Sequence, residues 1–185
     1  DFSLWALAIE YEKARGNISA DEVFEKMRVI IRVMDNAIQQ GLKGTQYNDR
    51  ILGSQSLQFR EKMNRGELVA GDAGNLMILY VSAIMEVKSS MGVIVAAPTA
   101  GSCGALPGAL FGVAHALGLS EDELVKAMLS AGLIGVFIAA HATFAAEVGG
   151  CMAETGSGGG MAAAAIVQMK GGSLDQSLAA ASMAL

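Results

Sequence analysis

Hydrophobic residues recur along the first half of the chain at intervals of three and four residues, the spacing that places them on one face of an α-helix. A capping box formed by Ser19 and Glu22 begins one of these stripes, and Gly41 is expected to end it as a C-cap. The next segment, residues 42–66, is polar and irregular, which indicates a loop or short elements that the pattern does not place. The first half is therefore predicted to contain helices at residues 4–14, 20–40 and 68–88.

The second half continues the helical pattern, with glycines between the apolar stretches. Residues 91–95 are β-branched and indicate a strand or an extended lead-in to a loop at residues 97–104. Glycines are expected to break the pattern at residues 149–151 and again at residues 157–160. Two further capping boxes are Ser120 with Glu123 and Ser173 with Gln176. The predicted fold is mainly α: one Ala- and Gly-rich helical domain over residues 1–185, whose last helix has no stop signal, so we expect the natural chain to continue.

Composition excludes several classes of protein. The chain has 185 residues, of which 52% are hydrophobic, and its net charge is -5, which excludes a disordered chain. It carries 13 basic and 18 acidic residues without a basic cluster, so we expect no nucleic acid partner. Two cysteines are too few for a disulfide framework, which favours a reducing compartment and a cytoplasmic location. Aromatic residues make up 5%, so the core is expected to use small and aliphatic side chains, with 23 glycines allowing close approach.

Charge is concentrated in the first half of the chain. Of the 31 charged residues, 23 lie in residues 1–88, and residues 127–146 form an uncharged window as long as a membrane span. That window contains polar residues and has no Trp or Tyr belt. We expect no signal peptide, because no basic region precedes an apolar run at the start of the sequence. We therefore interpret the window as a buried core helix and expect no membrane contact.

The loop at residues 97–104 is the first candidate for chemistry. It combines small residues with the hydroxyls of Thr99 and Ser102 and the thiol of Cys103. Its backbone amides suit a carboxylate, especially where Gly104 begins the next helix. A tight turn between helices that happens to contain hydroxyls is the alternative.

The second candidate is residues 147–160, where Cys151 is flanked by glycines and two carboxylates, Glu147 and Glu154, lie in a largely uncharged region. A cysteine in these surroundings is a candidate metal ligand or nucleophile. A buried carboxylate would also need a partner, and no Lys or Arg lies between Lys126 and Lys170 to pair with it locally. A free buried cysteine that packs as a small hydrophobic residue is the alternative. The glycines at 158–160 also resemble a phosphate cradle, but a Walker lysine and a preceding strand are lacking.

His115 and His141 lie on apolar helices, where a lone histidine is most often a satisfied core residue. His141 is the better candidate for chemistry because it is six residues from Glu147. A Cys–His nucleophilic pair stays open, since no spacing selects it.

The two candidate segments together resemble a known family. Ala97-Pro98-Thr99-Ala100-Gly101-Ser102-Cys103-Gly104 and Gly150-Cys151-Met152-Ala153-Glu154-Thr155-Gly156 are similar to the paired motifs of iron–sulfur-dependent L-serine dehydratases. The resemblance implies a mainly helical catalytic domain that deaminates L-serine to pyruvate and ammonia with a [4Fe–4S] cluster. It also implies a cytoplasmic lyase with a β chain partner, a homodimer or both.

By the same resemblance, Cys151 is a cluster ligand, and the loop of Thr99, Gly101, Ser102, Cys103 and Gly104 binds the substrate. His141 and Glu154 are the candidate proton-transfer groups. Only one residue matches a cluster ligand, so we expect either that the other ligand cysteines lie beyond Leu185 or that this relative has lost the cluster. The segment that precedes Cys151 is one residue longer than the family pattern, and Met152 stands where Gln is usual.

Two other functions stay open. One is a cysteine desulfidase-like relative that acts on L-cysteine. The other is a non-catalytic helical interaction or membrane module built from the Ala- and Gly-rich helices.

Overall fold

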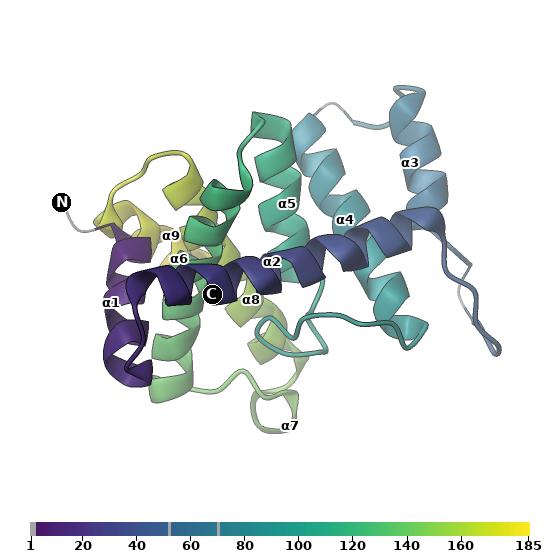
Figure 1. Cartoon of the computed structure of the whole chain (residues 1–185). Coiled ribbons are helices and arrows are strands. Elements are labelled where there is room, and N and C mark those ends of the chain that lie inside the picture. The colour runs from purple at the N-terminus through teal and green to yellow at the C-terminus, as the bar shows by residue number, and fades with distance from the viewer. Residues whose placement is uncertain (1–2, 52, 70) are drawn as a thin grey trace.

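The fold is a bundle of α-helices, crossed in front by one long helix that runs from one end of the molecule to the other (Figure 1). The computed structural model describes residues 3–51, 53–69 and 71–185, and these ranges contain helices without any strand. In chain order they are α1 (Leu4–Gly16), α2 (Ala20–Lys43), α3 (Ser56–Asn64), α4 (Asp72–Ser89), α5 (Ala105–Leu117), α6 (Glu121–His141), α7 (Ala146–Gly149), α8 (Cys151–Met169) and α9 (Leu174–Ala184). The mainly α prediction is confirmed. Residues 91–95 contain no strand: Met91 lies in a turn at a φ of 62°, and residues 92–95 have no regular secondary structure.

Serine side chains begin three of the helices, as the capping patterns predict. Ser120 and Ser173 form complete capping boxes at the starts of α6 and α9. Ser19 accepts a hydrogen bond from the backbone N–H of Glu22 at 3.1 Å, which is half of the predicted box. The Glu22 carboxylate instead pairs with Lys26 at 3.0 Å.

One prediction about the first half is corrected. Gly41 does not end α2, which continues to Lys43 and is capped by Gly44 at a φ of 96°. Gly41 serves close packing instead: a Cβ there would lie 2.7 Å from the Cβ of Ala83 in α4. The segment at residues 42–66, where a loop or short elements were expected, contains the short helix α3, whose position the polar composition of residues 56–64 concealed.

A carboxylate from another helix caps α3. Glu86 of α4 accepts hydrogen bonds from the backbone N–H groups of Gln55 and Ser56 at 2.6 and 3.0 Å, and from the hydroxyls of Ser54 and Ser56. Burial raises the pKa of Glu86, but these hydrogen bonds outweigh it and the net pKa lies below the ordinary value. The α3 start therefore depends on α4, which explains why no local cap predicts it.

Another correction concerns α8, which runs unbroken through the glycines at 157–160, where a break was predicted. A missing side chain here allows one neighbour to come close: a Cβ at Gly160 would lie 2.9 Å from Leu185 Cγ and 3.1 Å from the carbonyl oxygen of Ala181. A Cβ at Gly158 would make ordinary van der Waals contact, 3.5 Å from the Cβ of Ala105. Tertiary packing therefore outweighs the low helix propensity of glycine.

The contact between α4 and α5 is also made by glycines. A Cβ at Gly108 would lie 2.7 Å from the backbone nitrogen of Val81, and one at Gly112 would lie 2.6 Å from that of Met77. Gly104 continues the row at the start of α5, where a Cβ would lie 3.0 Å from the carbonyl oxygen of Val81. The row is spaced by four residues, so it forms one seam along which the two helix backbones nearly touch.

Helix α6 passes through the core, as the uncharged window predicts. Its buried residues run from Leu124 to Gly135, and it packs against α1, α2 and α8. Within the described ranges it is the one helix long and apolar enough to cross a membrane, and 56% of that stretch is buried inside the protein. Its final turns, from Phe137 to His141, are largely exposed.

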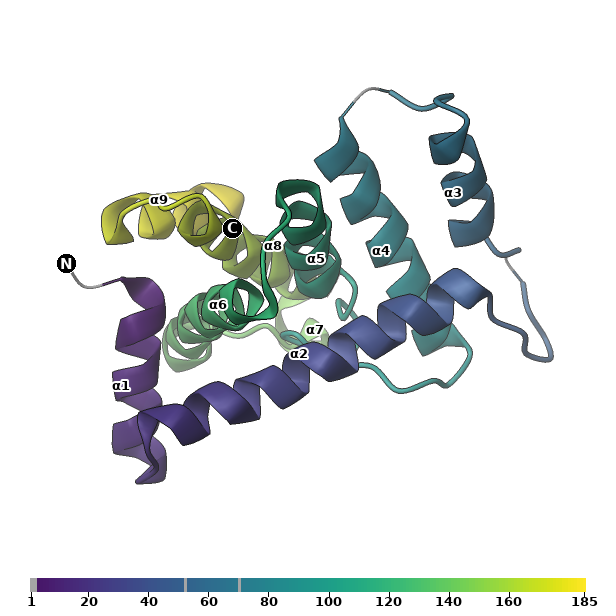
Figure 2. The ribbon, with the colours of Figure 1, turned by 45° about the horizontal axis from the view of Figure 1, so that its top comes forward.

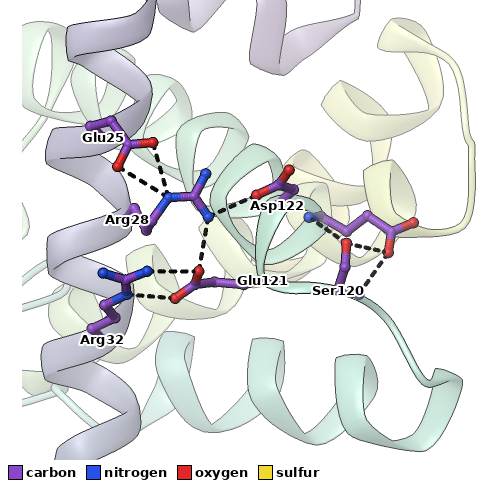
Figure 3. Close-up of polar contacts among 7 residues, drawn as sticks. Glu25, Arg28, Arg32, Ser120, Glu121 and Asp122 are labelled. Carbon is purple, nitrogen blue, oxygen red and sulfur yellow. Dashed lines mark hydrogen bonds and ion pairs between the residues drawn. The ribbon is translucent and has the colours of Figure 1, made fainter.

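An ion-pair network fastens α2 to the first turn of α6 (Figure 3). Arg28 contacts Glu121 at 2.9 Å and Asp122 at 2.7 Å, and Arg32 contacts Glu121 at 2.8 Å. The two carboxylates also lie at a helix N-terminus, where the helix dipole favours negative charge. Hydrogen bonds from Arg32 and Arg28 lower the pKa of Glu121 to about 2.

The close contact between α4 and α5 predicts that a single methyl group added on this seam destabilises the folded protein. Gly108→Ala places a Cβ against α4 backbone atoms, which cannot rotate away, so we expect it to lower the free energy of unfolding by about 1–3 kcal/mol. Gly74→Ala in α4 is the matched control, because nothing lies within 4 Å of its Cβ position, and it should leave stability unchanged or raise it by about 1 kcal/mol. Urea unfolding followed by circular dichroism measures both, and equal stabilities would contradict the seam.

The network predicts a pH-dependent contribution to stability. The folded-state pKa of Glu121 lies below its ordinary value of 4.5, so the contribution is complete above about pH 4.5 and is lost as the pH falls through about 2. The stability difference between the wild type and Glu121→Gln should therefore shrink over that range in urea titrations. Glu147→Gln, which removes an exposed carboxylate without an ion pair among the described residues, should follow the wild-type pH dependence. A constant difference for Glu121→Gln would refute this role.

Candidate functional site

The two segments singled out by sequence meet in space. The Thr99 hydroxyl donates a hydrogen bond to the carboxylate of Glu154 at 2.6 Å, although 55 residues separate them in the chain. The hydroxyls of Thr99 and Ser102 lie 3.1 Å apart, and the Ser102 N–H points to the Thr99 hydroxyl at 3.3 Å. A loop between α4 and α5 and the first turns of α8 thus form one polar site.

Backbone geometry brings the loop and α8 this close. Gly150, at a φ of 78°, turns the chain into α8 and places Glu154 in its first turn, where a carboxylate is favoured. Opposite it, a Cβ at Gly101 would lie 2.5 Å from both Glu154 carboxylate oxygens. Glycine at position 101 therefore lets the carboxylate sit against the loop backbone.

Cys103 and Gly104, two predicted substrate-binding residues, face a different neighbour. The Cys103 thiol is fully buried and lies 3.9 Å from the sulfur of Met85 in α4. Burial raises the pKa of this thiol, which favours the protonated form. Gly104 packs on Val81 of the same helix. These two residues hold the loop against α4, whereas Thr99, Gly101 and Ser102 form the side next to Glu154.

Cys151 is exposed at the first position of α8, three residues before Glu154. Residues three apart share one face of a helix, so the thiol and the carboxylate project from the same side of α8. Glu147, expected to be buried and in need of a partner, is exposed on α7. That expectation was wrong because α7 lies on the surface rather than within the uncharged core.

The two histidines differ in their surroundings. His141 is exposed at the end of α6, and no hydrogen bond links it to Glu154 within the described residues. Its catalytic role stays a prediction. His115, expected in the core, is exposed on α5 and lies 2.9 Å from the hydroxyl of Tyr80 through Nδ1, between the rings of Tyr80 and Phe111.

The described residues do not hold a metal or a cluster by themselves. No group of three His, Cys, Asp or Glu side chains among them is close enough to bind a metal ion. A [4Fe–4S] cluster needs several thiolates, and the described chain offers one exposed thiol, since Cys103 is buried against α4. Cys151 can supply one ligand, and the rest of a ligand set is absent from these residues.

Sequence reasoning missed the contact between α8 and the first residues of the loop. It lies at Gly158, where a Cβ would be at van der Waals distance, 3.6 Å, from Cδ of Pro98. The glycine run at 158–160 was the available signal, but it suggested a helix break or a phosphate cradle. Glycines spaced along one helix face are equally typical of a close helix contact.

The different burial of the two cysteines predicts different reactivity. Iodoacetamide should modify Cys151 in the native protein, whereas Cys103 should react only after unfolding, because its thiol is inaccessible and its pKa is raised. Peptide mass spectrometry after timed labelling measures both rates. Labelling of Cys103 at a rate near that of Cys151 would show that the loop does not pack as described.

Sequence comparison with known proteins finds relatives that share one named activity. The chain is 35% identical to the probable L-serine dehydratase, alpha chain, of Bacillus subtilis (strain 168) over 89% of its own length and 55% of the relative. It is 33% identical to the L-serine dehydratase, alpha chain, of Peptoniphilus asaccharolyticus over 98% of its own length and 63% of the relative. L-serine dehydratase 1 of Escherichia coli (strain K12) is 26% identical, with all of this chain and 41% of the relative covered.

The chain thus spans between about half and two thirds of these two alpha chains. The family model described as serine dehydratase alpha chain matches residues 1–185, and so includes both segments of the polar site. The resemblance inferred from the two motifs is confirmed: the chain belongs to the serine dehydratase alpha chain family.

Proposed function

We propose that this chain takes part in the deamination of L-serine to pyruvate and ammonia, with the substrate bound between the loop at residues 97–104 and the start of α8. The contact between Thr99 and Glu154 carries the proposal, because it joins both motifs at a single polar site. Relatives named L-serine dehydratase supply the substrate class.

Residues of the site can pair with both the ammonium group and the carboxylate of an amino acid substrate. The Glu154 carboxylate suits a substrate ammonium or the proton on the α-carbon, and Thr99 fixes the position of this carboxylate. The Ser102 hydroxyl and the loop amides suit the substrate carboxylate. Gly101 lets the Glu154 carboxylate lie directly against the loop backbone, so this carboxylate and the loop amides stand close to one another.

The reaction needs a base at the α-carbon and help for the departing hydroxyl. We propose that Glu154 accepts the α-proton, so that the C–H electron pair forms the new carbon–carbon double bond as the C–O bond breaks. The hydroxyl leaves as water after it gains a proton. The resulting enamine tautomerises to an imine, which water hydrolyses to pyruvate and ammonia.

Cys151 is the residue of this chain that we propose as a ligand of a [4Fe–4S] cluster. When bound, such a cluster supplies an open iron that acts as a Lewis acid on a hydroxyl. The exposed thiol on the Glu154 face of α8 supports this role. The other ligands have to come from outside the described residues, and a β chain, a second copy or further polypeptide are the proposed sources. Two free thiols suit a reducing cytoplasm.

Substitution of Glu154 tests the proposal. In the complete enzyme, with the polypeptide that supplies the other cluster ligands present, purified without oxygen and reconstituted with iron and sulfide, Glu154→Gln should lower kcat/KM for pyruvate release from L-serine. The expected loss is about 10²–10⁴-fold, the contribution of a general base. Calorimetric titration with L-serine reports binding separately from turnover. Glu147→Gln is the matched control, because it neutralises an exposed carboxylate outside the site and should stay within about twofold of wild type.

Two further measurements complete the experiment: a pair of threonine variants and a second substrate. Thr99→Val should reduce kcat/KM because it releases Glu154, whereas Thr155→Val, which removes an exposed hydroxyl on the same helix, should not. L-cysteine as substrate tests the desulfidase-like alternative, which predicts faster pyruvate release from L-cysteine than from L-serine. An inactive wild type, or full activity in Glu154→Gln, would refute the proposed role.

A further inference from the structure

A cavity lies between α1, α2 and α6, apart from the loop at residues 97–104. Figure 2 shows α1 and the first half of α2 as the two arms of a V, with α6 between them. The cavity measures about 280 Å³, and it shares none of its lining with the site around Glu154. Apolar side chains that form its walls include Val23, Met27, Ile30, Leu129 and Leu133.

The mouth of this cavity is polar and carries both signs of charge. Arg15 and Lys26 supply two cations there, and Glu12 supplies an anion beside Tyr11. In the structure Arg15 pairs with Glu12 at 2.6 Å, and Lys26 pairs with Glu22 at 3.0 Å. Exposed pairs of this kind contribute about 0–1 kcal/mol, so a ligand can replace them at little cost.

Gly132 is the feature that keeps the cavity open. It lies in the interior of α6, where glycine costs about 0.5–1 kcal/mol relative to alanine. Packing explains the neighbouring Gly135, whose Cβ would lie 2.9 Å from Met161, but nothing lies within 4 Å of the Cβ position of Gly132. Its missing side chain therefore relieves no contact within the described chain, and it instead extends the space that the cavity offers.

We propose that this cavity binds a free α-amino acid with an apolar side chain. Its volume is close to the lower end of small-molecule sites, about 300 Å³, which suits a ligand of amino acid size and excludes a nucleotide. The apolar walls match the side chain. The paired charges at the mouth match a zwitterion, with the carboxylate near Lys26 or Arg15 and the ammonium near Glu12.

Calorimetric titration of the purified chain with L-leucine tests this site without any need for catalysis. Two analogues serve as charge controls: 4-methylpentanoate lacks the ammonium, and 3-methylbutylamine lacks the carboxylate. We expect L-leucine to bind at least fivefold more tightly than either analogue. L-serine should not displace it, since the lining of this cavity has no residue in common with the Glu154 site.

Gly132→Leu fills the cavity and should weaken L-leucine binding at least tenfold. Gly74→Leu is the matched control, because Gly74 also lies in a helix with nothing within 4 Å of its Cβ position and lines no part of this cavity. Lys26→Gln leaves the apolar walls unchanged and should weaken L-leucine binding while it spares 3-methylbutylamine. Circular dichroism confirms that each variant is folded.

Several results would overturn the proposal. These are no heat of binding from L-leucine, unchanged binding in Gly132→Leu, or equal affinity for all three ligands. Sedimentation equilibrium adds one more: a dimer that Gly132→Leu dissociates would assign the cavity to a second copy of the chain. Loss of activity in Glu154→Gln does not bear on any of these outcomes, so the two proposals fail separately.

Discussion

The close approach of α5 to α4 is the constraint on which the rest of the structure depends. Three glycines one turn apart, Gly104, Gly108 and Gly112, let the backbones of the two helices nearly touch. Contact at this distance fixes both the separation of the helices and their rotation, because any side chain on the seam would collide with backbone atoms rather than with a mobile side chain. The loop that connects α4 to α5 is therefore held at both ends by a rigid pair.

Helix α8 uses the same device on the face towards α9. A Cβ at Gly160 would lie 3.1 Å from the carbonyl oxygen of Ala181, so the missing side chain lets α9 pack closely there, whereas Gly158 lies at ordinary contact distance from the loop and the start of α5. Glu154 lies between these contacts and the N-terminus of the helix, so its carboxylate is carried by a helix that is packed on two sides. A hydrogen bond of 2.6 Å to Thr99 is consistent with such fixed surroundings.

Local patterns in the sequence were sufficient where the physical cause is local. Ser120 and Ser173 satisfy the first N–H groups of their own helices, so their capping boxes were found from spacing alone. The start of α3 depends on Glu86, some thirty residues away, and no local pattern encodes that contact. Helix α8 was divided in error because glycine propensity is a local quantity, whereas the space that its glycines provide is set by α5 and α9.

The candidate site divides in the same way. The motifs identified Thr99 and Glu154 as important, but only the fold shows that they touch. The sequence alone does not show that the two cysteines differ in solvent exposure. The Cys103 thiol is buried against Met85, whereas Cys151 is exposed at the start of a helix. The uneven charge of the sequence has a structural counterpart here. Among the described residues Glu154 forms no ion pair, and its partners are instead the Thr99 hydroxyl and the N-terminus of its own helix.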